Sequence, residues 1–488
     1  MWTTLFDLIA VLYGEVKKFG KVKPQNSITK EMSDSLEKEA KDLIYSKFPA
    51  NNTHFDGEMC VNPRDFYDII NYCKEKNDFL FFRSVLCQLD SMLDIDILIK
   101  KHDFNKYDDG VSLRAFDSLN ENHQETGITI IPNVPSLPNT FFVNKESGFE
   151  DKEYKNANYW YDNINDHFNN IICISNDVLD GYKINNVIID LFKKREKDKI
   201  VIGVTPCCNS HLKELMDVHE YCNEETGTQH FAVEEYYNPN FLTDIFLKCL
   251  SLAKNSQVDI LIGPEMLGSL ELCEPDDIGF NQHFRDENGQ APHLIATPSL
   301  WRDGKNYISV YLKSGELIGK QYKQNCFELT DEGRRYEEDL KDVPKEILLI
   351  HVPGWGRITF PICVDLLVPD YRDLLARHLK SNLILCPSYS TGTVQFGNAS
   401  GTMRDFDARL VWLNSCSALR KFSDTPKAIG SVTVPITNPD DLEASSKKIC
   451  PKCEGKCLEC CLFTIDIQAR SQGDRHCNDV EIKHVSLE

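Results

Sequence analysis

The chain has 488 residues, of which 41% are hydrophobic and 26% charged, and its formal net charge at pH 7 is −21. This composition is typical of a globular protein with two or three domains, and the acidic charge argues against direct binding to nucleic acid or to an anionic membrane surface. No stretch is apolar and long enough to span a bilayer. The 19 cysteines, together with an N-terminus that lacks a secretory signal, predict a cytoplasmic protein with free thiols.

Residues 1–105 are predicted to form a helical domain. Asn62-Pro63 and Asn77-Asp78 are suitable helix starts, and apolar residues recur at helical spacing. The region contains no glycine-rich loop, metal-ligand spacing or catalytic constellation, so we interpret it as a module that binds a protein partner. The expected helices span residues 3–19, 29–46, 63–74 and 79–101.

Residues 106–197 are rich in Asn, Asp, Pro and Gly and are predicted to form an irregular connector. Strand-like runs occur at 127–132 and 169–175, and residues 183–197 are expected to form a helix. These pieces could belong to either neighbouring domain.

From residue 198 onward, strands and helices alternate. A strand at 200–204, a helix at 239–255 and a strand at 258–262 form a βαβ unit, which places Glu265 directly after a buried strand. A cysteine- and acid-rich insertion, 207–235, interrupts this unit.

A hairpin comes next, with predicted strands at 307–312 and 317–322 joined by a turn that contains Gly315. Lys323 follows the second strand directly. A lysine in this position is usually solvent-facing, so its interest depends on what else lies at the ends of neighbouring strands.

A second βαβ unit spans residues 357–388. An apolar strand at 358–362 ends on Cys363, a helix follows at 370–380, and a further strand starts at Asn382. A cysteine at a strand-to-helix elbow is well placed for chemistry, because backbone N–H groups there lower a thiol pKa and can hold an oxyanion.

The elements of this unit resemble the nucleophile segment of the carbon–nitrogen hydrolases of the nitrilase superfamily. The matching residues are Ile362-Cys363-Val364-Asp365, Pro369-Asp370-Tyr371-Arg372 and Pro387-Ser388. The resemblance covers residues 198–488 and implies an α/β fold, a nitrilase-type α-β-β-α sandwich, behind the mainly helical N-terminal domain. Gly263, Thr359 and Pro361 depart from the family pattern and bear on pocket shape.

The resemblance also implies the roles of the site residues. Cys363 is expected to be the nucleophile and Glu265 the general base. Lys323, with the backbone N–H of Val364, is expected to stabilise the oxyanion. A second glutamate is expected from the loop after the lysine, where Glu332 has better spacing than Glu328.

The implied activity is hydrolysis of a small linear amide, or less readily a nitrile, through a thioester and without a catalytic cofactor. Family members commonly form homo-oligomers, which is also expected here. The alternative is a catalytically weak or inactive nitrilase-fold oligomerisation module. Such a module could belong to a larger bacterial antiphage system that is associated with a reverse transcriptase. Retention of Glu265, Lys323 and Cys363 favours the enzyme.

A cysteine-rich insertion at 440–461 forms a second constellation. Cys450 and Cys453, then Cys457 and Cys460, make two C-x2-C pairs, which predict a structural zinc site with four thiolate ligands. The short gap between the pairs leaves two alternatives, an iron–sulfur cluster and a cysteine cluster that binds no metal.

Overall fold

The computed structural model of the chain separates into two compact units. The first unit extends to Gly181 and the second begins at Tyr182. The residues described are 3–19, 30–48, 55, 59–94, 126–133, 164–189, 199–208, 210–224, 227–286, 290–331, 334–353, 355–390, 392, 394–406, 408–420, 428–435, 446–450, 460–468 and 480–485. Within these ranges, no helix is long and apolar enough to cross a membrane.

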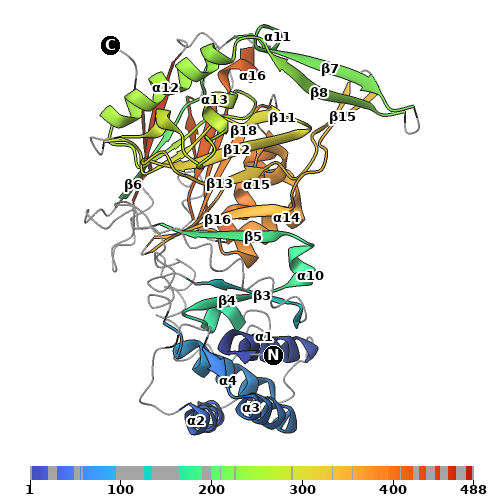
Figure 1. The fold of residues 1–488 in the computed structure, drawn as a ribbon, viewed down its shortest axis with the longest axis vertical. Helices are drawn as coiled ribbons and strands as arrows, with labels where there is room; N and C mark the ends of the chain where they lie inside the picture. The colour runs from blue at the N-terminus through green and yellow to red at the C-terminus, as the bar shows by residue number, and fades with distance from the viewer. Residues whose placement is uncertain are drawn as a thin grey trace. The chain divides into compact units, whose positions relative to one another are not determined.

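The first unit contains a helix at each of the four places expected from the sequence, but the fourth, predicted at 79–101, already ends at Ser91 (Figure 1). The side chain of Asn62 accepts a hydrogen bond from the Arg64 N–H, and Asp78 accepts one from Phe81, so both predicted helix starts are confirmed. A two-stranded sheet joins β1 (Thr3–Thr4) to β2 (Cys60–Val61). The helices are α1 (Leu5–Lys18), α2 (Lys30–Lys47), α3 (Pro63–Lys76) and α4 (Phe79–Ser91).

Part of the predicted connector is regular structure in the first unit. Strands β3 (Ile128–Pro132) and β4 (Ile171–Ser175) pair antiparallel, and the helix α10 (Asn176–Leu179) follows. The buried carboxylate of Asp90, on α4, accepts hydrogen bonds from three successive backbone N–H groups at the start of β4. This contact ties the helices to the β3–β4 pair.

The first large sheet of the second unit has the strand order β11-β12-β10-β9-β6-β22-β23, and β13 also pairs with β12. Helices α12 (Pro239–Asn255) and α13 (Leu270–Cys273) pack on it through a shared apolar cluster. The strands are β6 (Lys199–Val204), β9 (Ile260–Ile262), β10 (Leu294–Ala296), β11 (Leu300–Arg302), β12 (Lys305–Leu312), β13 (Leu317–Tyr322), β22 (Leu462–Gln468) and β23 (Val480–Val485).

The second large sheet has the order β21-β20-β19-β18-β17-β16-β5. Every residue of its central strands β18 and β19 is buried, as expected for strands covered on both faces. The strands are β5 (Lys183–Ile188), β16 (Glu346–Val352), β17 (Gly356–Thr359), β18 (Leu383–Ser388), β19 (Arg409–Asn414), β20 (Gly430–Thr433) and β21 (Ser446–Ile449).

The predicted helix at 183–197 is wrong over its first part. Lys183–Ile188 is the strand β5, which pairs in parallel with β16 and extends the second sheet. Its apolar residues Ile184, Val187 and Ile188 fit the spacing of a helix face as well as that of a buried edge strand. The available edge of β16, a tertiary feature, decides between the two. Residues 190–198 lie outside the described part.

The two sheets contact each other, and helices cover them, so the predicted α/β sandwich is confirmed (Figure 1). The side chain of Gln321 on β13 accepts a hydrogen bond from the Leu348 N–H on β16, which links one sheet to the other. The segment after β17 forms η5 (Cys363–Leu367), α14 (Pro369–Asp373) and η6 (Leu374–His378), and α15 (Val394–Asp405) follows β18.

The predicted insertion at 207–235 contains a long hairpin. Its strands β7 (Met216–Cys222) and β8 (Gln229–Tyr236) join β14 (Glu328–Asp331) and β15 (Arg334–Glu338) in a four-stranded sheet of order β14-β15-β8-β7. This third sheet brings the insertion beside the loop that follows Lys323.

Candidate active site

Glu265 lies just beyond the carboxyl end of β9 and is 2% exposed. The chain turns sharply there, since Met266 has a φ of +68°. Gly263 is needed for this path, because a Cβ at this position would lie 2.5 Å from the backbone nitrogen of Pro298. The departure from the family pattern at Gly263 therefore has a steric reason.

Three donors from different parts of the chain hold the Glu265 carboxylate. Oε1 accepts from Nζ of Lys323 at 2.8 Å and from Nδ2 of Asn306 at 3.0 Å, and Oε2 accepts from the Tyr389 N–H at 2.7 Å. Neither Asn306 nor Tyr389 was expected from the sequence. Asn306 is the second residue of β12 and Tyr389 directly follows β18, but neither residue type by itself signals a role in catalysis.

Lys323 directly follows β13, as expected, and its side chain is 3% exposed. Its Nζ contacts two carboxylates, Glu265 at 2.8 Å and Oε2 of Glu338 at 2.6 Å. Lys323 is therefore a buried cation paired with two buried carboxylates, and it does not face solvent as a lysine after a hairpin usually does.

Glu338 occupies the place that the sequence analysis gave to Glu332 or Glu328. Glu328 is exposed and pairs with Arg335 at 2.6 Å, so it is not part of this cluster, and Glu332 lies outside the described residues. Glu338 ends β15, and the sequence signal that could have found it is an acidic residue at a strand end after the lysine loop. That strand becomes recognisable only through its pairing with β14 and β8.

The strand predicted at 358–362 ends earlier than expected, because β17 stops at Thr359. Cys363 begins η5 at the elbow predicted from the sequence. It is 3% exposed and has a φ of +52°. This left-handed conformation is uncommon for a residue with a side chain and is found disproportionately at functional sites. Val364 follows Cys363 in the same turn, so its backbone N–H belongs to the residue next to the thiol in sequence.

Asp365 joins the cysteine elbow to the lysine loop. Its buried carboxylate accepts hydrogen bonds from the Ile362 N–H at 3.1 Å, the Gln324 N–H at 3.0 Å and the Asn325 N–H at 2.8 Å. Burial raises the pKa of Asp365 to about 7, although these donors oppose the shift. Because this carboxylate binds both the residue before Cys363 and the two residues after Lys323, it fixes the position of Lys323 relative to Cys363.

The charges of the cluster influence one another strongly. Burial alone would lower the pKa of Lys323, but the negative charges of Glu265 and Glu338 outweigh it and hold the pKa well above its usual value. The pKa of Glu338 is raised, because the effect of burial is larger than the opposing effect of the positive charge of Lys323. Burial and the charge of Glu265 raise the pKa of the Cys363 thiol well above its usual value, against the effect of Lys323. The site thus favours a neutral thiol beside a base and a permanent cation.

The predicted zinc site is only partly within the described residues, because Cys453 and Cys457 lie outside them. Cys450 follows β21, and Cys460 precedes β22. The Sγ of Cys460 lies 3.2 Å from the Sγ of Cys249 on α12, a partner that the sequence spacing did not indicate. Within the described ranges, no group of three or more His, Cys, Asp or Glu residues is arranged to hold a metal ion. The zinc site stays a prediction.

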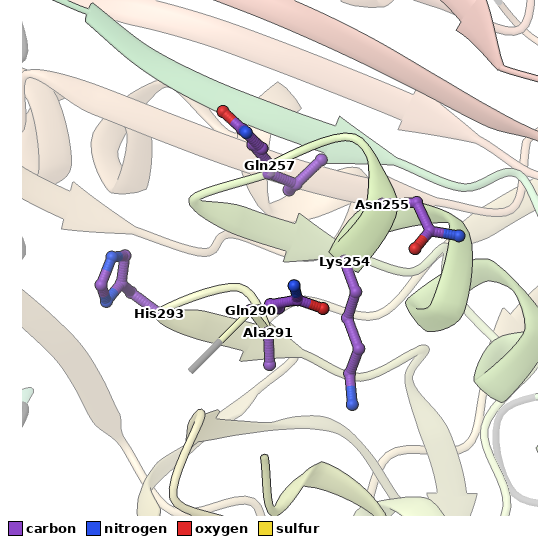
Figure 2. A pocket seen from close by; sticks show the side chains of 7 residues that line it. Lys254, Asn255, Gln257, Gln290, Ala291 and His293 are labelled. Carbon is purple, nitrogen blue, oxygen red and sulfur yellow. The ribbon is translucent and has the colours of Figure 1, made fainter. Parts of the chain in front are cut away.

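A surface pocket of about 360 Å³ lies away from this cluster (Figure 2). It is at the amino ends of β9 and β10, whereas Glu265 follows the carboxyl end of β9. Figure 2 shows side chains from the end of α12 and from the segment before β10 around it. Its lining residues are Lys254, Asn255, Gln257, Val258, Gln290, Ala291 and His293.

No protein-family model matches the chain, and no curated protein matches it in sequence. Among solved structures, it is similar to an amidase of the nitrilase superfamily from Nesterenkonia (12% identity, 56% of this chain and 92% of that chain, TM-score 0.34). It is also similar to Nit3 of Saccharomyces cerevisiae, a member of branch 10 of the nitrilase superfamily (13%, 55% and 90%, TM-score 0.35). A third is a glutamine-dependent NAD+ synthetase from Acinetobacter baumannii (12%, 57% and 48%, TM-score 0.33).

These solved structures include proteins of the nitrilase superfamily, the family whose nucleophile segment the sequence resembles.

Proposed function

We propose that the chain hydrolyses the carbon–nitrogen bond of a small linear amide, with Cys363 as nucleophile. The observation that carries the proposal is the buried Lys323 ammonium held between two carboxylates, close enough for the charges of Lys323 and Glu265 to act on the thiol of a cysteine in a left-handed elbow. This arrangement supplies a nucleophile, a base and a fixed cation, which are the three groups that amide hydrolysis through a thioester needs.

In the proposed reaction, a Glu265 oxygen takes the proton of the Cys363 thiol as sulfur attacks the carbonyl carbon. The ammonium of Lys323 and the N–H of Val364 stabilise the negative oxygen of the tetrahedral intermediate. When the carbon–nitrogen bond breaks, Glu265 returns the proton to the leaving nitrogen, and ammonia or an amine departs. Glu265 then activates a water molecule, which hydrolyses the thioester and frees the thiol.

Glu338 is assigned a supporting role in this proposal. Its carboxylate shares the ammonium of Lys323 with Glu265. Two carboxylates on one ammonium keep the lysine protonated and fixed while the charge of Glu265 changes during proton transfer. The substrate must be small or must enter by local movement, because all four site residues are at most 3% exposed.

Thiol reactivity mapped by peptide mass tests the proposal. Limiting iodoacetamide is added near neutral pH to the wild type, Glu265→Gln and Lys323→Ala. Lys320→Ala serves as the control for the lysine variant, because Lys320 lies on β13, three residues before Lys323, and pairs with Glu274 instead. Preferential labelling of Cys363 over the equally buried Cys386, lost in the two site variants but kept in the control, supports an activated nucleophile.

A second measurement is ammonia release from a panel of short-chain linear amides, with Cys363→Ala as the blank. If Cys363 labels no faster than Cys386 and the site variants change nothing, the catalytic proposal fails. The chain is then better explained as a nitrilase-fold oligomerisation module, and its mass in solution becomes the next measurement.

A further inference from the structure

The β7–β8 hairpin has no part in the chemistry proposed above, yet it pairs with the strand that carries Glu338. Strand β8 runs parallel to β15 with Phe231 opposite Glu338 (Figure 1). The N–H of the next residue, Asp339, donates a hydrogen bond to the Phe231 carbonyl at 3.0 Å. The backbone on the C-terminal side of Glu338 is therefore attached to the hairpin.

The other side of Glu338 is attached to β14. The Phe327 N–H donates to Oε2 of Glu338 at 2.9 Å, and the Glu338 N–H donates to the Phe327 carbonyl at 2.9 Å. Without β7 and β8, the pair β14–β15 would be a two-stranded ribbon, which is marginally stable by itself in water. The hairpin makes it part of a four-stranded sheet.

The hairpin can act as a support because its base is anchored in the core. Leu215, Met216 and Val233 belong to the buried apolar cluster that also contains residues of α12. The Tyr236 hydroxyl accepts a hydrogen bond from the Trp301 N–H at 3.1 Å, which ties the end of β8 to β11. Strand β8 is thus fixed to the first large sheet at its end and to β15 over its first three residues, Gln229–Phe231.

A side-chain cluster fixes the segment that follows Glu338. The carboxylate of Asp339 raises the pKa of the Tyr221 hydroxyl on β7, so the two groups lie close together. Asp339 also pairs with Nζ of Lys341 at 2.6 Å, and this Nζ lies 5.7 Å from the centre of the Tyr221 ring. The Lys341 N–H donates to the Gly304 carbonyl at 2.7 Å, so this segment is also tied to the turn before β12.

We propose that the β7–β8 hairpin is a positioning element of the active site, and that Tyr221 and Asp339 are positioning residues that keep Glu338 in contact with Lys323. The inference rests on the proposed function, because it assigns the hairpin a role toward the same cluster. Displacements of about 1 Å in a catalytic group can lower rates by about a hundredfold, so a support of this kind has a measurable consequence.

The test measures the rate of Cys363 alkylation by iodoacetamide across pH in the full chain. The charged and titratable groups that act on the thiol are Glu265, Lys323, Cys386 and Glu338, and Asp365 lies in the same turn. Because Glu338 raises the pKa of the thiol, Glu338→Gln should move the midpoint of the labelling profile to lower pH.

Tyr221→Phe and Asp339→Ala should move the midpoint in the same direction by less than Glu338→Gln does, because they displace the carboxylate and do not remove it. In the Glu338→Gln background, the same two substitutions should produce no further shift, because they act through Glu338. Tyr237→Phe is the matched control, since this exposed tyrosine directly follows β8 and its pKa is influenced by Asp217 and Glu235, not by the segment after Glu338.

The inference is overturned if Tyr221→Phe and Asp339→Ala leave the midpoint unchanged, or if their shifts persist in full in the Glu338→Gln background. Either result can occur while Cys363 remains selectively reactive, and the proposed function then stands without the hairpin's role. If wild-type Cys363 shows no selective labelling at all, the proposed function fails, and the inference fails with it.

Discussion

Replacing Lys323 by methionine should make the stability of the second unit strongly dependent on pH. The substitution keeps the length of the side chain and removes the only charge-compensating partner that the structure gives to both Glu265 and Glu338 within the described residues. At 2.6 to 2.8 Å and an effective dielectric constant of about 20, each lost attraction is about 6 kcal/mol before desolvation is subtracted. Breaking a buried ion pair in this way destabilises proteins by about 3–5 kcal/mol.

The magnitude depends on pH because a buried carboxylate without its cation takes up a proton. Its folded-state pKa is then raised above the unfolded value of about 4.3, so the folded state binds a proton that the unfolded state has lost. The stability of the variant is therefore highest below about pH 4 and falls as pH rises toward the folded-state pKa. At about 1.4 kcal/mol per pH unit for one proton, the variant should lose about 4 kcal/mol between pH 5 and pH 8.

The assay is urea unfolding near pH 5 and near pH 8, followed by tryptophan fluorescence. Trp301, Trp355 and Trp412 are buried in the second unit and report on its unfolding. Lys320→Met is the matched control, because the side chains of Lys320 and Glu274 are 22% and 33% exposed and such pairs contribute about 1 kcal/mol or less. If Lys323→Met unfolds at the wild-type urea concentration near pH 8, or becomes more stable as pH rises, the reasoning is wrong.

Three further predictions concern other buried groups. Asp365→Asn should flatten the pH dependence of the free energy of unfolding of the second unit in urea. Because the folded-state pKa of Asp365 is about 7, this carboxyl contributes its full stability below about pH 4 and loses it as pH rises through about 7. An unchanged slope of the free energy of unfolding against pH would contradict this. Gly263→Ala should slow Cys363 alkylation by about a hundredfold, since the new Cβ would displace the segment that carries Glu265, whereas Gly397→Ala, with open space around its Cβ, should leave the rate unchanged. Asp90→Ala should destabilise the first unit by about 2–4 kcal/mol, because three N–H groups lose their acceptor; amide hydrogen exchange in β4 would show it as lost protection.

Local patterns in the sequence were enough to locate the strands that lead to the site residues. The Pro264-Glu265 pair after β9 and the hairpin before Lys323 are short-range features, and these strands end where they were predicted to end. The strand before Cys363 was also expected, but it ends at Thr359 and not at Ile362. The helix starts at Asn62 and Asp78 were equally local, since a cap needs only a side chain and the N–H groups of the next turn. Burial on both faces made the central strands easy to recognise as apolar runs.

Tertiary structure decided which side chains meet. Glu338 was missed because its strand exists only through pairing with β14 and with the distant β8. Strand β5 was mistaken for a helix because six residues do not distinguish the two periods, and the edge of β16 does. Long-range packing also brings Cys460 beside Cys249, because α12 and the segment before β22 are far apart in sequence but share one core. Sequence periodicity determined where strands end, because it reflects local burial, and long-range packing determined the partners of the groups placed there.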